Sequence, residues 1–157
     1  MSATTAIRAL RAAGVAFDEH PYRYEERGGT RVSARELDVD EHLVIKTLVL
    51  QDAHRRLLLM LIHGDREVSL KALARQIGVR RIDPCEAVVA QRATGYRFGG
   101  TSPFGTRQRL PTYVERTVLA LPRIYVNGGA RGLLVSLPPA ALTTALGAVT
   151  VEVGIGA

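Results

Sequence analysis

Two β-rich runs near the middle of the chain limit its possible folds more than any other feature. Residues 43–51 read LVIKTLVLQ and residues 56–63 read RLLLMLIH, joined through Asp52, Ala53 and His54. Such a pair predicts an antiparallel hairpin. Because apolar residues occupy both faces, both strands are expected in the interior of a sheet. Helical patterns are interspersed with further strands that resemble hairpin partners, so the sequence indicates an α+β domain with a mixed sheet.

Capping and stop signals place the other elements around this hairpin. Ser33 and Glu36 have the spacing of a capping box, and Asp83-Pro84 followed by Glu86 predicts another helix start. We expect helices at 2–13, 33–38, 69–77, 83–94 and 138–146. We expect strands at 15–22, 43–51, 56–63, 114–121, 124–127, 133–137 and 148–153.

Composition is that of an ordinary globular protein with a basic surface. The 157 residues fit one domain spanning 1–157, and 46% of them are hydrophobic. No apolar run approaches the roughly 20 residues of a membrane span, and the first residues lack the pattern of a secretory signal. Cys85 has no second cysteine to pair with, so a reducing cytoplasm is the expected location. The net charge of +6 favours a polyanionic partner, most often nucleic acid.

Lys46 is unusual because it lies inside an apolar strand, in a chain with only one other lysine, Lys71. Strand alternation places it on the same face as Val44, Leu48 and Leu50. A lysine there either reaches water along its aliphatic stem at an exposed edge or holds its ammonium beside a pocket. In the second case, Lys46 is a candidate to contact an anionic or carbonyl oxygen of a ligand.

Glycine-rich segments are the second candidate site. Residues 95–111 are rich in Gly, Arg, Ser and Pro and lack periodicity, which predicts a long loop of the kind that often carries function. Within it, Gly99-Gly100-Thr101-Ser102-Pro103 could offer free backbone amides to an oxyanion, although a surface turn also explains the motif. Asn127-Gly128-Gly129 is either a hairpin turn or a second glycine wall of a pocket.

Other residues that could carry chemistry give weaker signals. The four histidines lack metal-ligand spacing and lie near turn signals, so most of them are expected to be exposed: His20, His42, His54 and His63. Cys85 is expected to be structural. The arginines around the glycine segments form either a phosphate-binding rim or a solvated face: Arg92, Arg97, Arg107, Arg109 and Arg131.

Five motifs, in this order, resemble the YbaK/EbsC family of aminoacyl-tRNA deacylases, which is related to the editing insertion of bacterial prolyl-tRNA synthetases. They are KTLV at 46–49, VAQRATGY at 89–96, GGTSPFG at 99–105, RLPT at 109–112 and IYVNGG at 124–129. The resemblance covers nearly the whole chain. It implies the editing-domain fold, a single α+β domain with a mixed, mostly antiparallel, curved sheet flanked by helices.

The resemblance implies a trans-editing enzyme that hydrolyses mischarged tRNA, most of all Cys-tRNA(Pro), with no metal or organic cofactor. It implies that Lys46 is essential and lies near the tRNA 3′ end. It also implies that backbone amides of one loop hold the aminoacyl carbonyl; the loop consists of Gly99, Gly100, Thr101, Ser102 and Pro103. It implies that the substrate thiol attacks its own ester. We expect substrate contacts from Tyr22, Thr47, Asn127, Gly128, Gly129 and Arg131. The expected partner is the aminoacylated acceptor end of tRNA, with prolyl-tRNA synthetase as a second candidate.

Two departures from the cysteine-specific pattern concern the pocket. Those members carry an aspartate in the strand after the second glycine motif, where this chain has Leu134. The segment between Tyr22 and Lys46 is also shorter than in those members. The aminoacyl group therefore stays open, with Ala, Ser or Thr as alternatives to Cys, and a noncatalytic tRNA-binding module of the same fold is the rival hypothesis.

Overall fold

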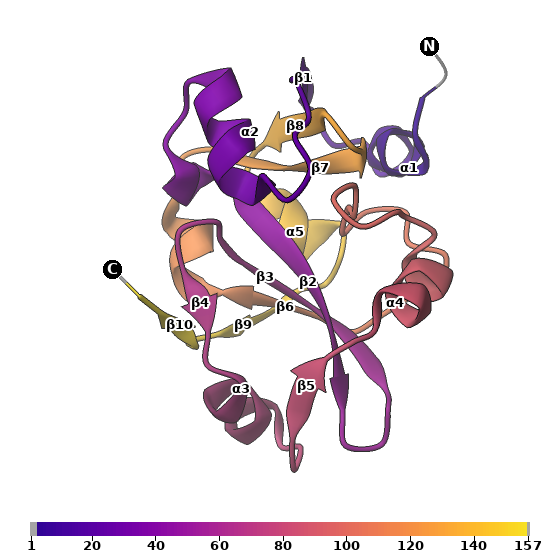
Figure 1. The fold of residues 1–157 in the computed structure, drawn as a ribbon, viewed down its shortest axis with the longest axis vertical. Helices are drawn as coiled ribbons and strands as arrows, with labels where there is room; N and C mark the ends of the chain where they lie inside the picture. Colours follow the sequence, from indigo (N-terminus) through magenta and orange to yellow (C-terminus); the bar gives the residue numbers. More distant parts are fainter. Residues whose placement is uncertain (1–2, 157) are drawn as a thin grey trace.

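The computed structural model describes residues 3–156, which form five α-helices and three sheets (Figure 1). The helices are α1 (Thr5–Ala12), α2 (Gly29–Leu37), α3 (Leu70–Ile77), α4 (Ala87–Thr94) and α5 (Ala140–Thr144). The strands are β1 (Asp18–Pro21), β2 (Ile45–Asp52), β3 (Leu57–His63), β4 (Glu67–Val68), β5 (Ile82–Pro84), β6 (Thr112–Glu115), β7 (Ile124–Ala130), β8 (Leu133–Leu137), β9 (Val149–Val151) and β10 (Gly154–Ile155). Short 3₁₀ helices occupy Glu41–Leu43 and Arg116–Ala120.

The expected hairpin is confirmed and forms the centre of the main sheet. Strands β2 and β3 pair antiparallel, with Lys46 opposite Ile62 and Leu50 opposite Leu58. The sheet has the order β5-β2-β3-β6-β9, in which β5 pairs antiparallel with β2 and the β3-β6 and β6-β9 pairs are parallel. The mixed α+β architecture predicted from the sequence is therefore correct.

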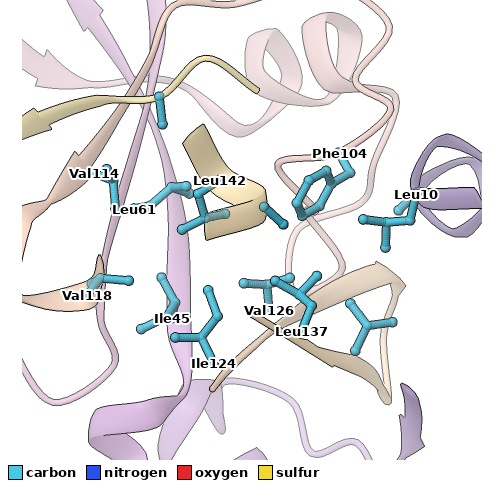
Figure 2. Packing of buried hydrophobic residues seen from close by; sticks show 14 of the residues in the cluster. Leu10, Ile45, Leu61, Phe104, Val114, Val118, Ile124, Val126, Leu137 and Leu142 are labelled. Carbon is cyan, nitrogen blue, oxygen red and sulfur yellow. The ribbon is translucent and has the colours of Figure 1, made fainter. Parts of the chain in front are cut away.

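The hairpin separates two apolar clusters, because its side chains alternate between its faces. Ile45 and Leu61 join a cluster with residues of α1, α5 and the β7-β8 hairpin, in which Figure 2 shows Leu142, Ile124 and Leu137 close to them. The opposite face contributes Leu50, Leu58, Met60 and Ile62 to a cluster that includes Leu73 of α3. Lys46 lies at one end of this second face.

A smaller antiparallel sheet, in the order β1-β8-β7, adjoins the start of β2. The two sheets meet through a parallel bridge between Val44 and Tyr125. Figure 1 shows this sheet beyond the start of β2, with α2 on one side and α1 on the other. Lys46 follows the bridge by two residues, so it lies where the two sheets come together.

Three of the expected boundaries differ from the structure by four residues or more. Asp83 and Pro84 belong to the edge strand β5, and α4 begins only after Glu86. A proline is tolerated in an edge strand, because its missing N–H costs no hydrogen bond of the sheet there. The strand expected at 114–121 ends at Glu115 and continues as a 3₁₀ helix. Helix α2 begins at Gly29, so Ser33 lies inside it and donates its hydroxyl to the Thr30 carbonyl instead of capping.

Within residues 3–156, every helix is too short or too polar to cross a lipid bilayer.

Candidate functional site

A cavity of about 350 Å³ opens where the two sheets meet. Its walls come from β2, from the segment 22–33 that leads into α2, from the glycine-rich loop and from β7 and β8. Six of the residues expected in the site line this cavity: Tyr22, Lys46, Thr47, Gly99, Thr101 and Asn127. We call it the lysine cavity. The other six lie outside its lining: Gly100, Ser102, Pro103, Gly128, Gly129 and Arg131.

Lys46 places an ammonium group at the lysine cavity without a strong competing partner. Its side chain is 22% exposed, and Nζ lies 3.7 Å from Oε1 of Glu67, whose own side chain is 80% exposed. An exposed ion pair of this length contributes little stability. The ammonium can therefore exchange Glu67 for an oxygen of a bound ligand.

Thr47, the next residue on β2, has an unusual hydroxyl group. Its Oγ1 is buried and has no hydrogen-bond partner among the described residues, and the residue lines the lysine cavity. An unpartnered buried hydroxyl costs about 1–3 kcal/mol relative to a bonded one. Such a group in a cavity wall is suited to a polar atom of a ligand.

The glycine-rich loop brings free backbone amides to the cavity. Within residues 3–156, the N–H groups of Gly99 and Thr101 have no acceptor, whereas the Gly100 N–H donates to the Arg97 carbonyl at 2.8 Å. Gly99 has φ of +86°, and a Cβ there would lie 2.6 Å from the hydroxyl oxygen of Tyr24. Only glycine therefore fits at this position, which lines the same cavity as Lys46.

The loop is held from the β7-β8 hairpin by two adjacent hydrogen bonds. Asn127 Nδ2 donates to the Gly99 carbonyl at 3.1 Å, and Arg131 Nε donates to the Phe98 carbonyl at 2.8 Å. Asn127 is itself fixed, because its Oδ1 accepts the N–H groups of Gly129 and Ala130. Asn127 and Arg131 are thus positioning residues.

The expected site residues outside the lysine cavity support the loop from behind. Gly100 lies against the backbone of Ala130 and Arg131, where a Cβ would approach to 3.0 Å. Ser102 is fully buried, and its hydroxyl accepts the Phe104 N–H at 3.1 Å. Tyr96 donates its hydroxyl to the Phe104 carbonyl, and burial raises the pKa of Tyr96 to about 12, so this phenol stays a donor at neutral pH.

Sequence reasoning missed Tyr24 and Phe98, which both line the lysine cavity. The spacing of Tyr22 and Tyr24 in an extended segment puts both rings on one side, and that signal could have identified the second tyrosine. Burial raises the pKa of the Tyr22 phenol, partly offset by a backbone hydrogen bond at Gly132, so it also remains protonated.

The expectation that most histidines are exposed is wrong: only His54 is exposed, His20 and His42 are half-buried, and His63 is 1% exposed. Its Nδ1 bonds the His42 carbonyl and its Nε2 bonds Thr117 Oγ1. Burial is the main cause that lowers the pKa of His63. Among the described residues, His42, His63 and Asp65 form one group whose donor atoms lie within 4.8 Å of one another. The two imidazoles stack in parallel at 3.7 Å, so their in-plane lone pairs do not converge on one ion.

Among residues 3–156, neither a histidine nor a cysteine lines the lysine cavity, and the one serine that does is Ser33. Its hydroxyl donates to a helix carbonyl. Cys85 lies in a neighbouring cavity, where burial raises the pKa of its thiol. The arrangement can therefore bind and polarise a carbonyl group, but the described lining offers no activated side-chain nucleophile.

Comparison with known proteins identifies the family and the fold of the chain. Residues 27–145 match the family of aminoacyl-tRNA editing domains. The chain is also similar to EbsC of Enterococcus faecalis (strain ATCC 700802 / V583), which is named as a candidate Cys-tRNA(Pro)/Cys-tRNA(Cys) deacylase. The two sequences are 29% identical over 140 residues, and the match covers 88% of this chain and 85% of that one.

Two solved structures share the fold over nearly their whole length. One is a hypothetical protein, with a TM-score of 0.88 and 23% identity, covering 96% of this chain and 99% of its own. The other is a candidate trans-editing enzyme for prolyl tRNA synthetase, with a TM-score of 0.84 and 22% identity. The match covers 99% of this chain and 100% of that one.

The loop clamp can be tested with Asn127→Asp. The aspartate keeps an acceptor for the Gly129 and Ala130 amides but cannot donate to the Gly99 carbonyl, so only the clamp is lost. We expect faster amide hydrogen exchange at Gly100, whose N–H is the one in residues 97–101 that donates a hydrogen bond within the described chain, by about tenfold for one lost bond of about 1.4 kcal/mol. Exchange in β3 should be unchanged. Equal exchange in the variant and the wild type would show that Asn127 does not hold the loop.

Proposed function

The chain belongs to the aminoacyl-tRNA editing domain family, and we propose that it is a deacylase that hydrolyses the ester of mischarged tRNA in trans, with Cys-tRNA(Pro) as its first substrate. The single observation that supports this most is the shared cavity of Lys46 and the free amides of Gly99 and Thr101. In this proposal the ester carbonyl binds between the ammonium and the glycine loop.

Stabilisation of negative charge is the main chemical contribution of such a site. Attack on an ester carbonyl places negative charge on its oxygen, and backbone N–H donors fixed in advance stabilise that charge. Lys46 adds a positive charge in a half-buried setting, where Coulomb attraction is stronger than in water. An aminoacyl ester is already activated, so positioning and charge stabilisation suffice without a protein nucleophile.

The attacking group comes from outside the protein in this mechanism. Water serves for any aminoacyl group, adding to the carbonyl carbon while the ribose oxygen departs with a proton. With a cysteinyl ester, the substrate's own thiol can instead attack the carbonyl carbon, which forms a thiolactone while the ribose oxygen departs with the thiol proton. Water then opens the thiolactone to the free amino acid. Both routes agree with a cavity whose lining lacks a histidine or cysteine.

The wall opposite the glycine loop favours a small, uncharged side chain. Leu134 is 4% exposed and lines the cavity at the position where a carboxylate was expected from the cysteine-specific pattern. Val32 and Val44 lie in the same lining. Burying a charged side chain against these groups is costly, whereas the side chains of Cys and Ala are accommodated. The same replacement also supports the rival hypothesis of a tRNA-binding module without turnover.

Replacing Lys46 by alanine tests the catalytic proposal. We expect Lys46→Ala to lower kcat/KM for deacylation of Cys-tRNA(Pro) about 100-fold or more, because a charge that stabilises the transition state is lost. Lys71→Ala is the matched control, since Lys71 is the only other lysine and is exposed on α3. Circular dichroism should show the same fold in both variants. Undiminished hydrolysis by Lys46→Ala would eliminate this role.

A substrate panel tests the specificity and the rival hypothesis together. Purified protein is incubated with tRNA(Pro) charged with Cys, Ala, Ser or Thr, and the remaining ester is measured over time. We expect hydrolysis of the Cys and Ala esters to exceed that of Ser and Thr, because Leu134 offers no partner to a hydroxyl. Binding of all four without loss of any ester would instead identify a noncatalytic binder.

Thr47→Val separates the function of the buried hydroxyl from its effect on stability. The substitution replaces the unpartnered hydroxyl by a methyl group of similar size, so the free energy of unfolding should stay equal or rise. If the hydroxyl bonds the substrate, kcat/KM should fall about tenfold, whereas Thr47→Ser should retain most activity. Full activity of Thr47→Val would show that this hydroxyl does not touch the substrate.

A further inference from the structure

The lysine cavity continues into two further hollows. A cavity of about 360 Å³, here called the helix cavity, lies between β2 and α4 and shares four wall residues with the lysine cavity: Thr47, Leu48, Phe98 and Thr101. A third hollow of about 230 Å³, here called the arginine hollow, adjoins the helix cavity at Gln91 and contains Arg92 and Arg107. The three form one track that begins at Lys46 and passes over α4.

Phe98 lies at the boundary between the first two cavities. Its side chain is 73% exposed, which is unusual for a phenylalanine on a firmly held backbone. The Phe98 carbonyl accepts the bond from Arg131, whose guanidinium lies 5.2 Å from the centroid of the Tyr24 ring. The backbone under the ring is therefore fixed, and Phe98 presents an apolar face on which a planar group can stack.

Unpaired arginines lie at the far end of the track. Between Glu86 and Glu115 the chain carries four arginines and no acidic residue. Within residues 3–156, neither Arg92 nor Arg107 has a carboxylate within 4.0 Å, whereas Arg81 and Arg116 on either side of this segment are both paired. The one acid lining the helix cavity, Glu67, lies near Lys46. Unpaired arginines on a chain segment without acidic residues favour a phosphate-bearing partner.

The covalent structure of the substrate sets the order in which its parts can occupy the three cavities. An aminoacyl ester is attached to the ribose of the terminal nucleoside, so a carbonyl held in the lysine cavity must have a nucleoside next to it. The helix cavity is the hollow that shares a wall with the ester site. The preceding nucleotides carry phosphates, and the arginine hollow follows next.

Resting on the proposed function, we propose that this track binds the 3′ end of the RNA. The terminal nucleoside occupies the helix cavity with its base stacked on Phe98, and Arg92 and Arg107 bind phosphates of the nucleotides before it. Stacking accepts any base. The track therefore holds an RNA end without reading its sequence, and discrimination is left to the aminoacyl side chain in the lysine cavity.

Binding of an uncharged oligonucleotide tests the track without any hydrolysis. The probe is a short single-stranded RNA that ends in CC followed by 2-aminopurine, whose fluorescence falls when it stacks on an aromatic ring. We expect wild-type protein to quench the probe, Phe98→Ala to lose the quenching and bind about tenfold more weakly, and Phe98→Tyr to retain both. The Tyr variant keeps the test valid if alanine perturbs the fold.

The arginines are tested by salt dependence. The double variant Arg92→Ala/Arg107→Ala should bind the probe more weakly, and its plot of log K against log salt should lose about 1.4 of its slope, as for two contacts to a single strand. Arg75→Ala/Arg80→Ala is the matched control, since both arginines are exposed and lie away from the track, on and after α3. Its affinity and slope should equal those of the wild type.

The outcomes separate the track from the proposed function. The track is refuted if the wild-type protein does not bind the probe. It is also refuted if the variants of Phe98, Arg92 and Arg107 all bind and quench the probe like the wild type. Both conclusions hold even if the protein hydrolyses charged tRNA. Quenching that depends on these residues, in a protein that hydrolyses none of the charged tRNAs, would support the track and refute the deacylase proposal.

Discussion

The geometry of the candidate site depends on two adjacent hydrogen bonds, from Asn127 to the Gly99 carbonyl and from Arg131 to the Phe98 carbonyl. Each connects the glycine-rich loop to the β7-β8 hairpin, and the hairpin meets β2 through the bridge at Val44. The position of the free loop amides relative to Lys46 is therefore set through the backbone of both sheets. A loop with few hydrogen bonds of its own becomes a defined wall because a rigid hairpin holds it.

This construction explains why so many residues of the loop are buried without facing the cavity. Ser102, Tyr96 and the close contact at Gly100 fill the space behind the amides and satisfy the backbone groups there. The described lining then combines the free peptide groups of the loop with the Lys46 ammonium, with Thr47 and its unpartnered hydroxyl, and with apolar and aromatic side chains. Much of the sequence signal in the loop reflects support of the site and not contact with a ligand.

Sequence patterns predicted the central hairpin, the two faces of β2 and most helices, because apolar periodicity and capping residues act locally. They failed at Asp83-Pro84, where pairing with β2 outweighed a helix-start signal, and at residues 116–120, where the chain bends after Glu115. The burial of His63 was also missed, since its partners, the His42 carbonyl and Thr117, are distant in sequence. The order of the motifs also predicted that Lys46 and the glycine-rich loop share one site. Only the tertiary structure distinguishes the loop residues that line the cavity, Gly99 and Thr101, from those that do not: Gly100, Ser102 and Pro103.

Backbone donors give the protein a particular kind of evolutionary freedom. Every residue except proline carries a peptide N–H, so substitutions other than those to proline keep the free loop amides. The wall formed by Leu134 and α2, in contrast, consists of side chains that can change one at a time. Natural variation in such a protein can alter which amino acid is accepted while the reaction centre stays intact, and new specificities can arise by drift on one side of the cavity.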